Sequence, residues 1–289
     1  MAQLLLNGLA LGAAYALVAL GFVLVLNATG AVNFAQGDMV VAGGYAAVAL
    51  AGLVQSLPGI LLLPLVLALM AVLGLLFSAL AYFPLKARPP TAVFISTIAG
   101  GIILQNGITA LFGSAPQTTP PLLGTAGYGS ADFLPDLQAL AIIGFAALLV
   151  LGQHILLSRT QLGRQLRATA QDREMAQALG VPVNRMIALT FALGAALAGA
   201  AGLLLANRFF VTPTAGGELM LKAYIAVAIG GWGSLPGAVL GALLIALFEV
   251  LIASWISYTA ASVALYGALL IILFLRPQGL FGEAAQRRA

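Results

Sequence analysis

The feature that most constrains this chain is a succession of apolar stretches, each about as long as a bilayer is thick. A membrane-spanning helix needs about 20 mostly apolar residues. Clear candidates are residues 3–26, 38–54, 58–82, 91–112, 138–157 and 186–206. Three more passes are predicted near 219–232, 236–254 and 259–275, although the first would reach only about 21 Å at 1.5 Å per residue. The pattern predicts an all-α, polytopic transmembrane helical bundle of eight or nine crossings, with residues 1–289 as a single domain.

Composition supports the bilayer as the main solvent of this chain. Hydrophobic residues make up 62% of it and charged residues only 7%, whereas soluble proteins carry about 25% charged residues. The absence of cysteine excludes disulfides, thiolate nucleophiles and cysteine metal sites, and we expect no metal site. The first apolar stretch lacks a basic n-region and is too long for a signal peptide, so we expect a retained helix.

The positions of the basic residues predict the orientation in the membrane. Ten of the twelve lysines and arginines lie in the connections 83–90 and 158–185 and in the C-terminal tail with Arg276, Arg287 and Arg288. Basic loops normally face the cytoplasm, so we expect a cytoplasmic C-terminus and an external N-terminus. This placement also argues against a nucleic-acid partner, despite the net charge of +4. Three crossings between residues 219 and 275 are then required.

Two segments interrupt otherwise apolar helices with Gly, Asn, Ser or Pro, namely residues 27–38 and 230–237. Broken helices at membrane depth persist where they are buried in protein or line a cavity, and a pair of them is typical of a transporter's substrate path. The alternative is a tight cytoplasmic turn whose amide side chains satisfy freed backbone groups. The candidate path residues are Asn33, Phe34, Gln36, Gly37, Gly231, Gly233, Ser234 and Glu249.

Glu249 is the acid that lies well inside an apolar run. Such a group is usually functional or paired: it could bind a substrate ammonium, but pairing with Arg208 or Lys222 is favoured. Asp38 is interpreted as a helix N-cap and dipole partner in preference to a proton relay. Several glycines are predicted to allow close helix packing: Gly8, Gly12, Gly194, Gly199 and Gly202.

Catalytic and nucleotide-binding signals are weak. With one histidine, His154, and no cysteine, a membrane hydrolase is disfavoured. No Gly-rich phosphate loop followed by lysine occurs. We therefore expect no enzyme activity and no cofactor in this chain, and an energy source in another subunit.

The connection 158–185 is longer than a turn requires. Met175 and Leu179 share a helix face because they are four residues apart, and the same spacing relates Leu162 to Leu166. Asp172 is a favourable N-cap, and Gly180 is a favourable residue after a helix end. Two short helices are predicted here. They would either dock on a partner or lie on anionic lipid headgroups.

Blocks spread along the chain resemble the permeases of the branched-chain (hydrophobic) amino acid ATP-binding-cassette import family, the Liv type. They are Gly30–Gly37 with Gly43, Gly44 and Tyr45; Ala176–Gly180 and Ala195–Gly202; and Gly230–Ala238 with Arg276–Gly282. Gln36 departs from the family pattern, in which histidine more often precedes the glycine. Related permeases carry urea or short amides, so these substrates stay an alternative, as does an ion-coupled transporter or channel.

The resemblance implies a heteromeric assembly in a bacterial cytoplasmic (inner) membrane. Two homologous permeases would pair, two ATP-binding subunits holding ATP and Mg²⁺ would dock on cytoplasmic coupling helices, and an external binding protein would deliver the substrate. The chain length suits the shorter permease type. The coupling region would map onto Gln161 to Gly180. The expected ATPase contacts are Arg164, Leu166, Arg167, Gln171, Asp172, Glu174, Met175, Leu179 and Gly180.

Overall fold

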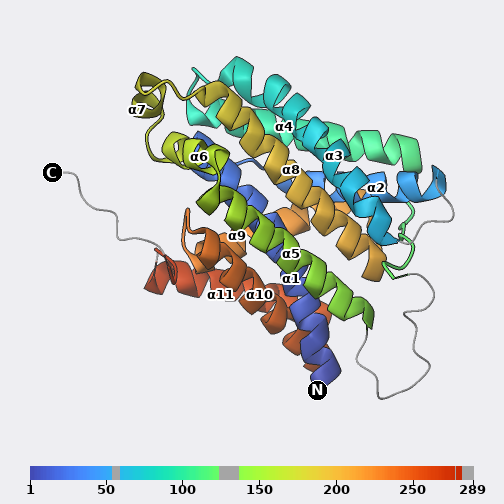
Figure 1. The fold of residues 1–289 in the computed structure, drawn as a ribbon. Coiled ribbons are helices and arrows are strands. Elements are labelled where there is room, and N and C mark those ends of the chain that lie inside the picture. Colours follow the sequence, from blue (N-terminus) through green and yellow to red (C-terminus); the bar gives the residue numbers. More distant parts are fainter. Residues whose placement is uncertain (54–58, 124–136, 277, 282–289) are drawn as a thin grey trace.

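The computed structural model describes residues 1–53, 59–123, 137–276 and 278–281, and within them the chain forms an all-helical bundle (Figure 1). Residues Pro277, Gly282, Arg287 and Arg288 lie outside the described residues. The principal helices are α1 (Ala2–Thr29), α2 (Gln36–Leu53), α3 (Gly59–Phe77), α4 (Pro90–Phe112), α5 (Leu137–Arg159), α6 (Gln161–Gln171), α7 (Arg173–Ala178), α8 (Val183–Arg208), α9 (Gly216–Gly230), α10 (Leu235–Trp255) and α11 (Tyr258–Leu275).

Seven of the described helices are long and apolar enough to cross a membrane, judged by length and composition: α1, α3 with its extension to Leu85, α4, α5, α8, α10 and α11. The helices α2 and α9 fall outside this set. Of the seven, α1 and α8 are the most buried, whereas α5 and α11 are the least. The two buried helices therefore form the centre of the bundle, and α5 and α11 lie at its edge.

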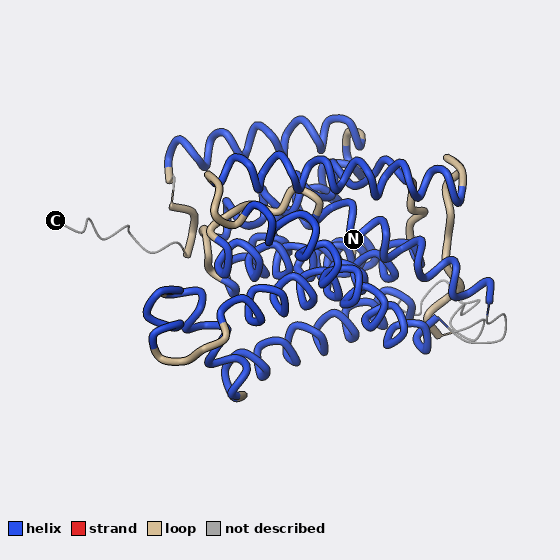
Figure 2. The backbone as a smooth tube through the Cα atoms, turned by 90° about the horizontal axis from the view of Figure 1, so that it is seen from above, coloured by secondary structure: helices blue, strands red, loops and turns tan. Residues whose placement is uncertain are grey.

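Packing around the two central helices organises the bundle. Helix α1 packs against α10, α8 and α5, and α8 packs against α3 and α2 as well. The long helices run side by side, and the pair α6–α7 projects at one end of the bundle (Figure 2). The N-terminus lies at the opposite end (Figure 1). The helical loop α6–α7 and the N-terminus therefore lie at opposite ends of the bundle.

Helices meet closely where both contribute small residues. A Cβ atom added to Gly202 of α8 would clash with the carbonyl oxygen of Val40 in α2, and one on Gly43 would clash with the backbone of Gly199. Gly8, Gly12 and Gly194 also lie against other helices. Small residues at membrane helix contacts permit backbones to approach and increase van der Waals contact. The predicted role of these glycines in close packing is confirmed.

Both predicted helix interruptions are confirmed. Helix α1 ends at Thr29, where Gly30 adopts a left-handed conformation (φ 63°) that favours glycine, and α2 begins at Gln36. Asp38 is the third residue of α2, so its assignment as an N-cap was wrong, but it is the acidic residue in the first turn, as the predicted dipole partner requires. At the second interruption, Ser234 caps α10 because its side chain accepts a hydrogen bond from the Gly237 backbone N–H at 3.1 Å.

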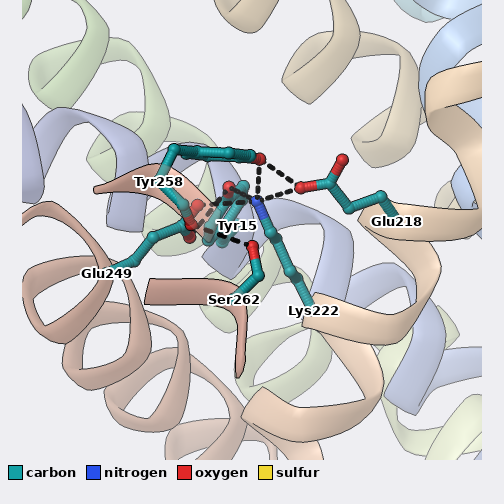
Figure 3. A network of polar contacts seen from close by, with 6 residues as sticks. All are labelled: Tyr15, Glu218, Lys222, Glu249, Tyr258 and Ser262. Atoms are coloured by element: carbon teal, nitrogen blue, oxygen red, sulfur yellow. Dashed lines mark hydrogen bonds and ion pairs between the residues drawn. The ribbon is translucent and has the colours of Figure 1, made fainter. Parts of the chain in front are cut away.

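A buried polar network joins α1, α9, α10 and α11 (Figure 3). The ammonium of Lys222 lies 2.7 Å from a carboxylate oxygen of Glu249 and 2.7 Å from one of Glu218. It also donates to the hydroxyl groups of Tyr15 and Tyr258, at 3.0 and 3.1 Å. Lys222 and Glu249 are both buried. The predicted pairing of Glu249 with Lys222 is therefore confirmed.

The Gly202 contact generates a stability prediction. In Gly202→Ala the added methyl group would force α2 and α8 apart, and overpacking of this kind costs about 1–3 kcal/mol. We expect a lower melting temperature in detergent, measured by fluorescence-detected size exclusion after heating. The matched control is Gly144→Ala on α5, where a Cβ meets no atom within 4 Å. Equal melting temperatures for the two variants would contradict the packing role.

The Lys222 network generates a second prediction. Lys222→Met leaves the Glu249 carboxylate buried without its counter-charge, which costs about 3–5 kcal/mol. The double variant Lys222→Met with Glu249→Gln should recover part of that loss, since no buried charge remains unpaired. Thermal unfolding of the wild type, both single variants and the double variant forms a thermodynamic cycle. Strictly additive losses would show that the two side chains are not coupled.

Candidate functional site

The loop between α5 and α8 forms two short helices, as predicted. Helix α6 begins after Thr160, whose side chain accepts a hydrogen bond from the Gly163 backbone N–H at 3.0 Å. Asp172 caps α7 in the same way, through the Met175 N–H at 3.0 Å. Gly180 follows the end of α7 with φ 80°, a conformation that favours glycine. The predicted caps are confirmed.

The loop presents one face to the bundle and another to the outside. Gly163, Leu166 and Thr169 are buried at intervals of three residues, so this stripe of α6 packs on the body of the protein. The exposed residues among the expected ATPase contacts are Arg164, Arg167, Gln171, Asp172, Glu174, Met175, Leu179 and Gly180. Leu166 is only 4% exposed and belongs to the hydrophobic core. Its side chain therefore anchors α6 to its own chain.

Helix α7 lies close to the first helix interruption. A Cβ atom built on Gly30 would lie 3.4 Å from a guanidinium nitrogen of Arg173. From the sequence, Arg173 was predicted only as one of several basic residues in the loop. Nothing in its spacing predicts that it lies near Gly30, which is more than a hundred positions earlier in the chain.

The predicted path residues of the first interruption are mostly buried in packed protein. The side-chain oxygen of Asn33 accepts a hydrogen bond from the Ala35 N–H at 3.2 Å, and Gln36 donates to the Gly194 carbonyl at 3.1 Å. Phe34 packs edge-on against another aromatic ring, with centroids 4.6 Å apart. A Cβ atom on Gly37 would clash with a backbone carbonyl of the segment that begins α9. In this conformation these side chains satisfy and pack the interrupted backbone.

The second interruption is held by two other segments. Asn27, near the end of α1, donates to the Gly233 carbonyl at 2.9 Å, so the two interruptions touch. After α11, the backbone N–H groups of Leu280 and Phe281 donate to the carbonyls of Ile229 and Gly230, at 2.8 and 3.0 Å. These hydrogen bonds satisfy backbone carbonyl groups at the end of α9, just before Gly231. The segment at the end of α9 and the segment after α11, which form the last of the sequence blocks that resemble the family, therefore lie together.

A wide apolar groove opens between α1, α5 and α10, with a volume of about 810 Å³. Its walls are formed mainly by aliphatic side chains, such as Leu20, Val150 and Val239. Polar side chains also line it: Gln153, His154, Ser158 and Arg167. None of the path residues predicted from sequence lines this groove. Sequence reasoning missed it because three helices distant in the chain are needed to form it.

Comparisons with known proteins agree with the resemblance seen in the sequence. Residues 4–274 match the family model described as branched-chain amino acid transport system / permease component. The chain is 34% identical to the high-affinity branched-chain amino acid transport system permease protein BraD of Pseudomonas aeruginosa, over 97% of this chain and 95% of that protein. It is 32% identical to the corresponding protein LivH of Escherichia coli, with the same coverage.

A permease of another import system matches a smaller part of the chain. The autoinducer 2 import system permease protein LsrC of Klebsiella pneumoniae is 34% identical over 50% of this chain and 47% of that protein. No solved structure matches the chain. The family match covers most of the sequence, and the branched-chain amino acid relatives are similar nearly end to end. This chain therefore belongs to the family of branched-chain amino acid transport system permease components.

Proposed function

We propose that this chain is a permease subunit of an ATP-driven importer of branched-chain or other hydrophobic amino acids. The observation that carries the proposal is similarity over 97% of the chain to two permeases whose names state that substrate class. A second homologous permease, two ATP-binding subunits and an external binding protein complete the proposed assembly. The substrate passes from the binding protein to the permease pair, and ATP hydrolysis in the partner subunits drives release on the other side.

The proposed ATPase docking surface is the exposed face of α6 and α7. It combines apolar anchors with charged groups: Met175 is 59% exposed and Leu179 is 77% exposed, and Arg164, Asp172 and Glu174 surround them. Exposed apolar side chains rimmed by polar ones are typical of protein interfaces. Leu166 is left out of this surface because it is buried. Contact between Arg173 and the Gly30 region offers a route from the docked ATPase to the interrupted helices.

We further propose nine crossings, with α2 and α9 added to the seven. Both helices pack within the bundle, α2 against α8 and α9 against α10. A helix surrounded by protein can be shorter and more polar than one facing lipid. With nine crossings, α6, α7 and the tail lie in the cytoplasm and the N-terminus lies outside. That orientation agrees with the basic residues of the loop and with its position opposite the N-terminus.

The path residues predicted at the two interruptions stay a prediction. Their side chains are engaged in this conformation, which supports a role in shaping the path rather than in forming its wall. Alternating access requires helices to change position. We propose that the interruptions are where α1, α2, α9 and α10 change direction when the ATPase moves the loop.

Transport itself gives the direct test. Proteoliposomes containing both permeases, the ATPase subunits and the binding protein should accumulate L-leucine only when ATP is present on the ATPase side. The measurement is uptake of radiolabelled leucine over time. A variant of the ATPase that binds but does not hydrolyse ATP is the control. Uptake by permeases alone, without any ATPase subunit, would contradict the proposal and favour an ion-coupled transporter.

The docking surface gives a separate prediction. Met175→Asp with Leu179→Asp should lower the amount of ATPase that co-purifies by about tenfold or more, since each buried apolar side chain contributes about 1.5–3 kcal/mol. The matched control is Ile256→Asp, a 74% exposed residue between α10 and α11, which should retain the ATPase. Equal ATPase recovery from both variants would show that α7 is not the contact.

A further inference from the structure

A carboxylate without a counter-charge lies inside the bundle. Asp38 is in the first turn of α2, and no ion pair or hydrogen bond among the described residues involves its side chain. Glu249, by contrast, is paired with Lys222. Ionisable side chains at membrane depth are costly, and they either pair with another group or belong to a substrate or ion pathway. Asp38 lacks the kind of partner that Glu249 has.

Two glycines show how deep this carboxylate lies. A Cβ atom added to Gly101 of α4 would clash with one carboxylate oxygen of Asp38, and a Cβ atom on Gly216 would clash with the other. Gly101 is the middle residue of α4, about 16 Å from either end at 1.5 Å per residue. The hydrocarbon core of a bilayer is about 30 Å thick. With α4 as a membrane span, the carboxylate lies near mid-membrane, where lipid headgroups do not reach.

The start of α2 supports a negative charge on Asp38 without neutralising it. A helix N-terminus carries the equivalent of about half a positive elementary charge, so part of the negative charge remains for a cation. Asp38 is also partly exposed, whereas its neighbours Gly37 and Met39 are buried. A small cation therefore has access to the carboxylate.

The surroundings of Asp38 suit an organic ammonium better than a divalent metal ion. Calcium takes six to eight oxygen ligands and magnesium needs six, and the described residues contain no group of three or more His, Cys, Asp or Glu side chains that could hold a metal ion. An ammonium has three N–H donors and pairs with one carboxylate. Gln105 is partly exposed and lies one turn beyond Gly101 on the same face of α4, so its amide oxygen is a second acceptor on this side.

We infer that Asp38 binds the α-ammonium of the transported amino acid at mid-membrane, between α2, α4 and α9. The inference rests on the proposed function and adds the residue that meets the substrate's positive charge. One carboxylate lowers the cost of bringing that charge into the bundle. It also holds the substrate weakly enough to release it, as passage along a path requires.

Photo-crosslinking with two competing ligands tests this assignment. Both permeases and the ATPase subunits, in lipid nanodiscs without the binding protein, are irradiated with a diazirine analogue of L-leucine, and adducts are mapped by mass spectrometry. We expect adducts within residues 34–42, 97–105 and 216–220. 3-Methylbutylamine, which keeps the ammonium but lacks the carboxylate, should displace the probe. 4-Methylpentanoate, which keeps the carboxylate but lacks the ammonium, should not displace it at the same concentration.

Substitutions of Asp38 test the role of its charge. Asp38→Asn should raise the concentration of 3-methylbutylamine needed for half-displacement by about tenfold or more, the loss expected for a hydrogen bond between charged groups. Asp38→Glu should bind the amine more tightly than Asp38→Asn, because it restores the charge. Thermal melts show which variants fold. The comparison of amine and acid on the wild type needs no variant.

Two glycines of α4 form a matched pair that leaves the charge in place. Gly101→Ala sets a methyl group against the Asp38 carboxylate, which must move, so the adduct yield should fall several-fold. Gly107→Ala is the control, since a Cβ atom there meets no atom within 4 Å, and it should keep the wild-type yield. Equal yields for the two variants would show that the position of the carboxylate does not matter.

Other outcomes also overturn the inference. Displacement by 4-methylpentanoate but not by the amine would show that the site recognises the substrate carboxylate. Displacement by sodium chloride but not by the amine would assign Asp38 to a metal cation. Unchanged displacement in Asp38→Asn would exclude Asp38 from binding.

The two proposals can fail separately. If the same complex, supplied with the binding protein and ATP, does not import leucine, the proposed function fails. If it imports leucine but Asp38→Asn binds the amine as the wild type does, only the ammonium site fails.

Discussion

Close backbone contact between helices is the constraint on which this structure depends. In a bilayer the lipid tails are as apolar as leucine, so burial of apolar surface does little to bring helices together. Contact must come from van der Waals packing over short distances. Gly202 against Val40, and Gly43 against Gly199, bring α2 and α8 together, and α1 meets α8 where Gly21 and Gly194 touch. The central helices owe their positions to residues that have almost no side chain.

The polar groups of the bundle divide into those that are satisfied and those that are available. At the helix interruptions, Gln36 donates to the Gly194 carbonyl of α8 and Asn27 donates to the Gly233 carbonyl, so both side chains bond to backbone within the bundle. Along the groove, by contrast, the Gln153 oxygen has no partner among the described residues. The contrast separates the interruptions, where polar atoms support the fold, from this part of α5, where a buried oxygen lacks a partner among the described residues.

Much of the fold could be predicted from the sequence, because span length, end caps and breakers act locally. The interruptions near Gly30 and Gly231, the two loop helices and the cap at Asp172 all follow from neighbouring residues. The side of a helix that faces the bundle cannot be predicted from neighbouring residues in this way. Leu166 was expected to meet a partner, but the turn before α6 directs it into the core. The residues at the interruptions stay predicted to shape the path; in this conformation Asn33, Gln36 and Gly37 of the first interruption are buried in packed protein.

The groove could not be predicted for a related reason. Gln153, His154 and Arg167 carry no spacing signal that relates them to Leu20 or Val239. The relation arises only when α1, α5 and α10 are assembled. Local rules therefore predict the helices and their ends, whereas the groove depends on tertiary contacts between segments far apart in the chain.

The sharing of Lys222 by two carboxylates limits how this protein can vary through evolution. A neutral residue at position 222 leaves Glu249 as a lone buried charge, and a neutral residue at position 249 removes the partner deepest in the bundle. The second change still leaves Lys222 paired with Glu218 at 2.7 Å, so loss of the Glu249 charge is better tolerated as a first step than loss of Lys222. The dependence of the two positions is therefore one-sided: a lineage that has lost Lys222 should also have lost the charge at position 249, whereas Lys222 can persist without it.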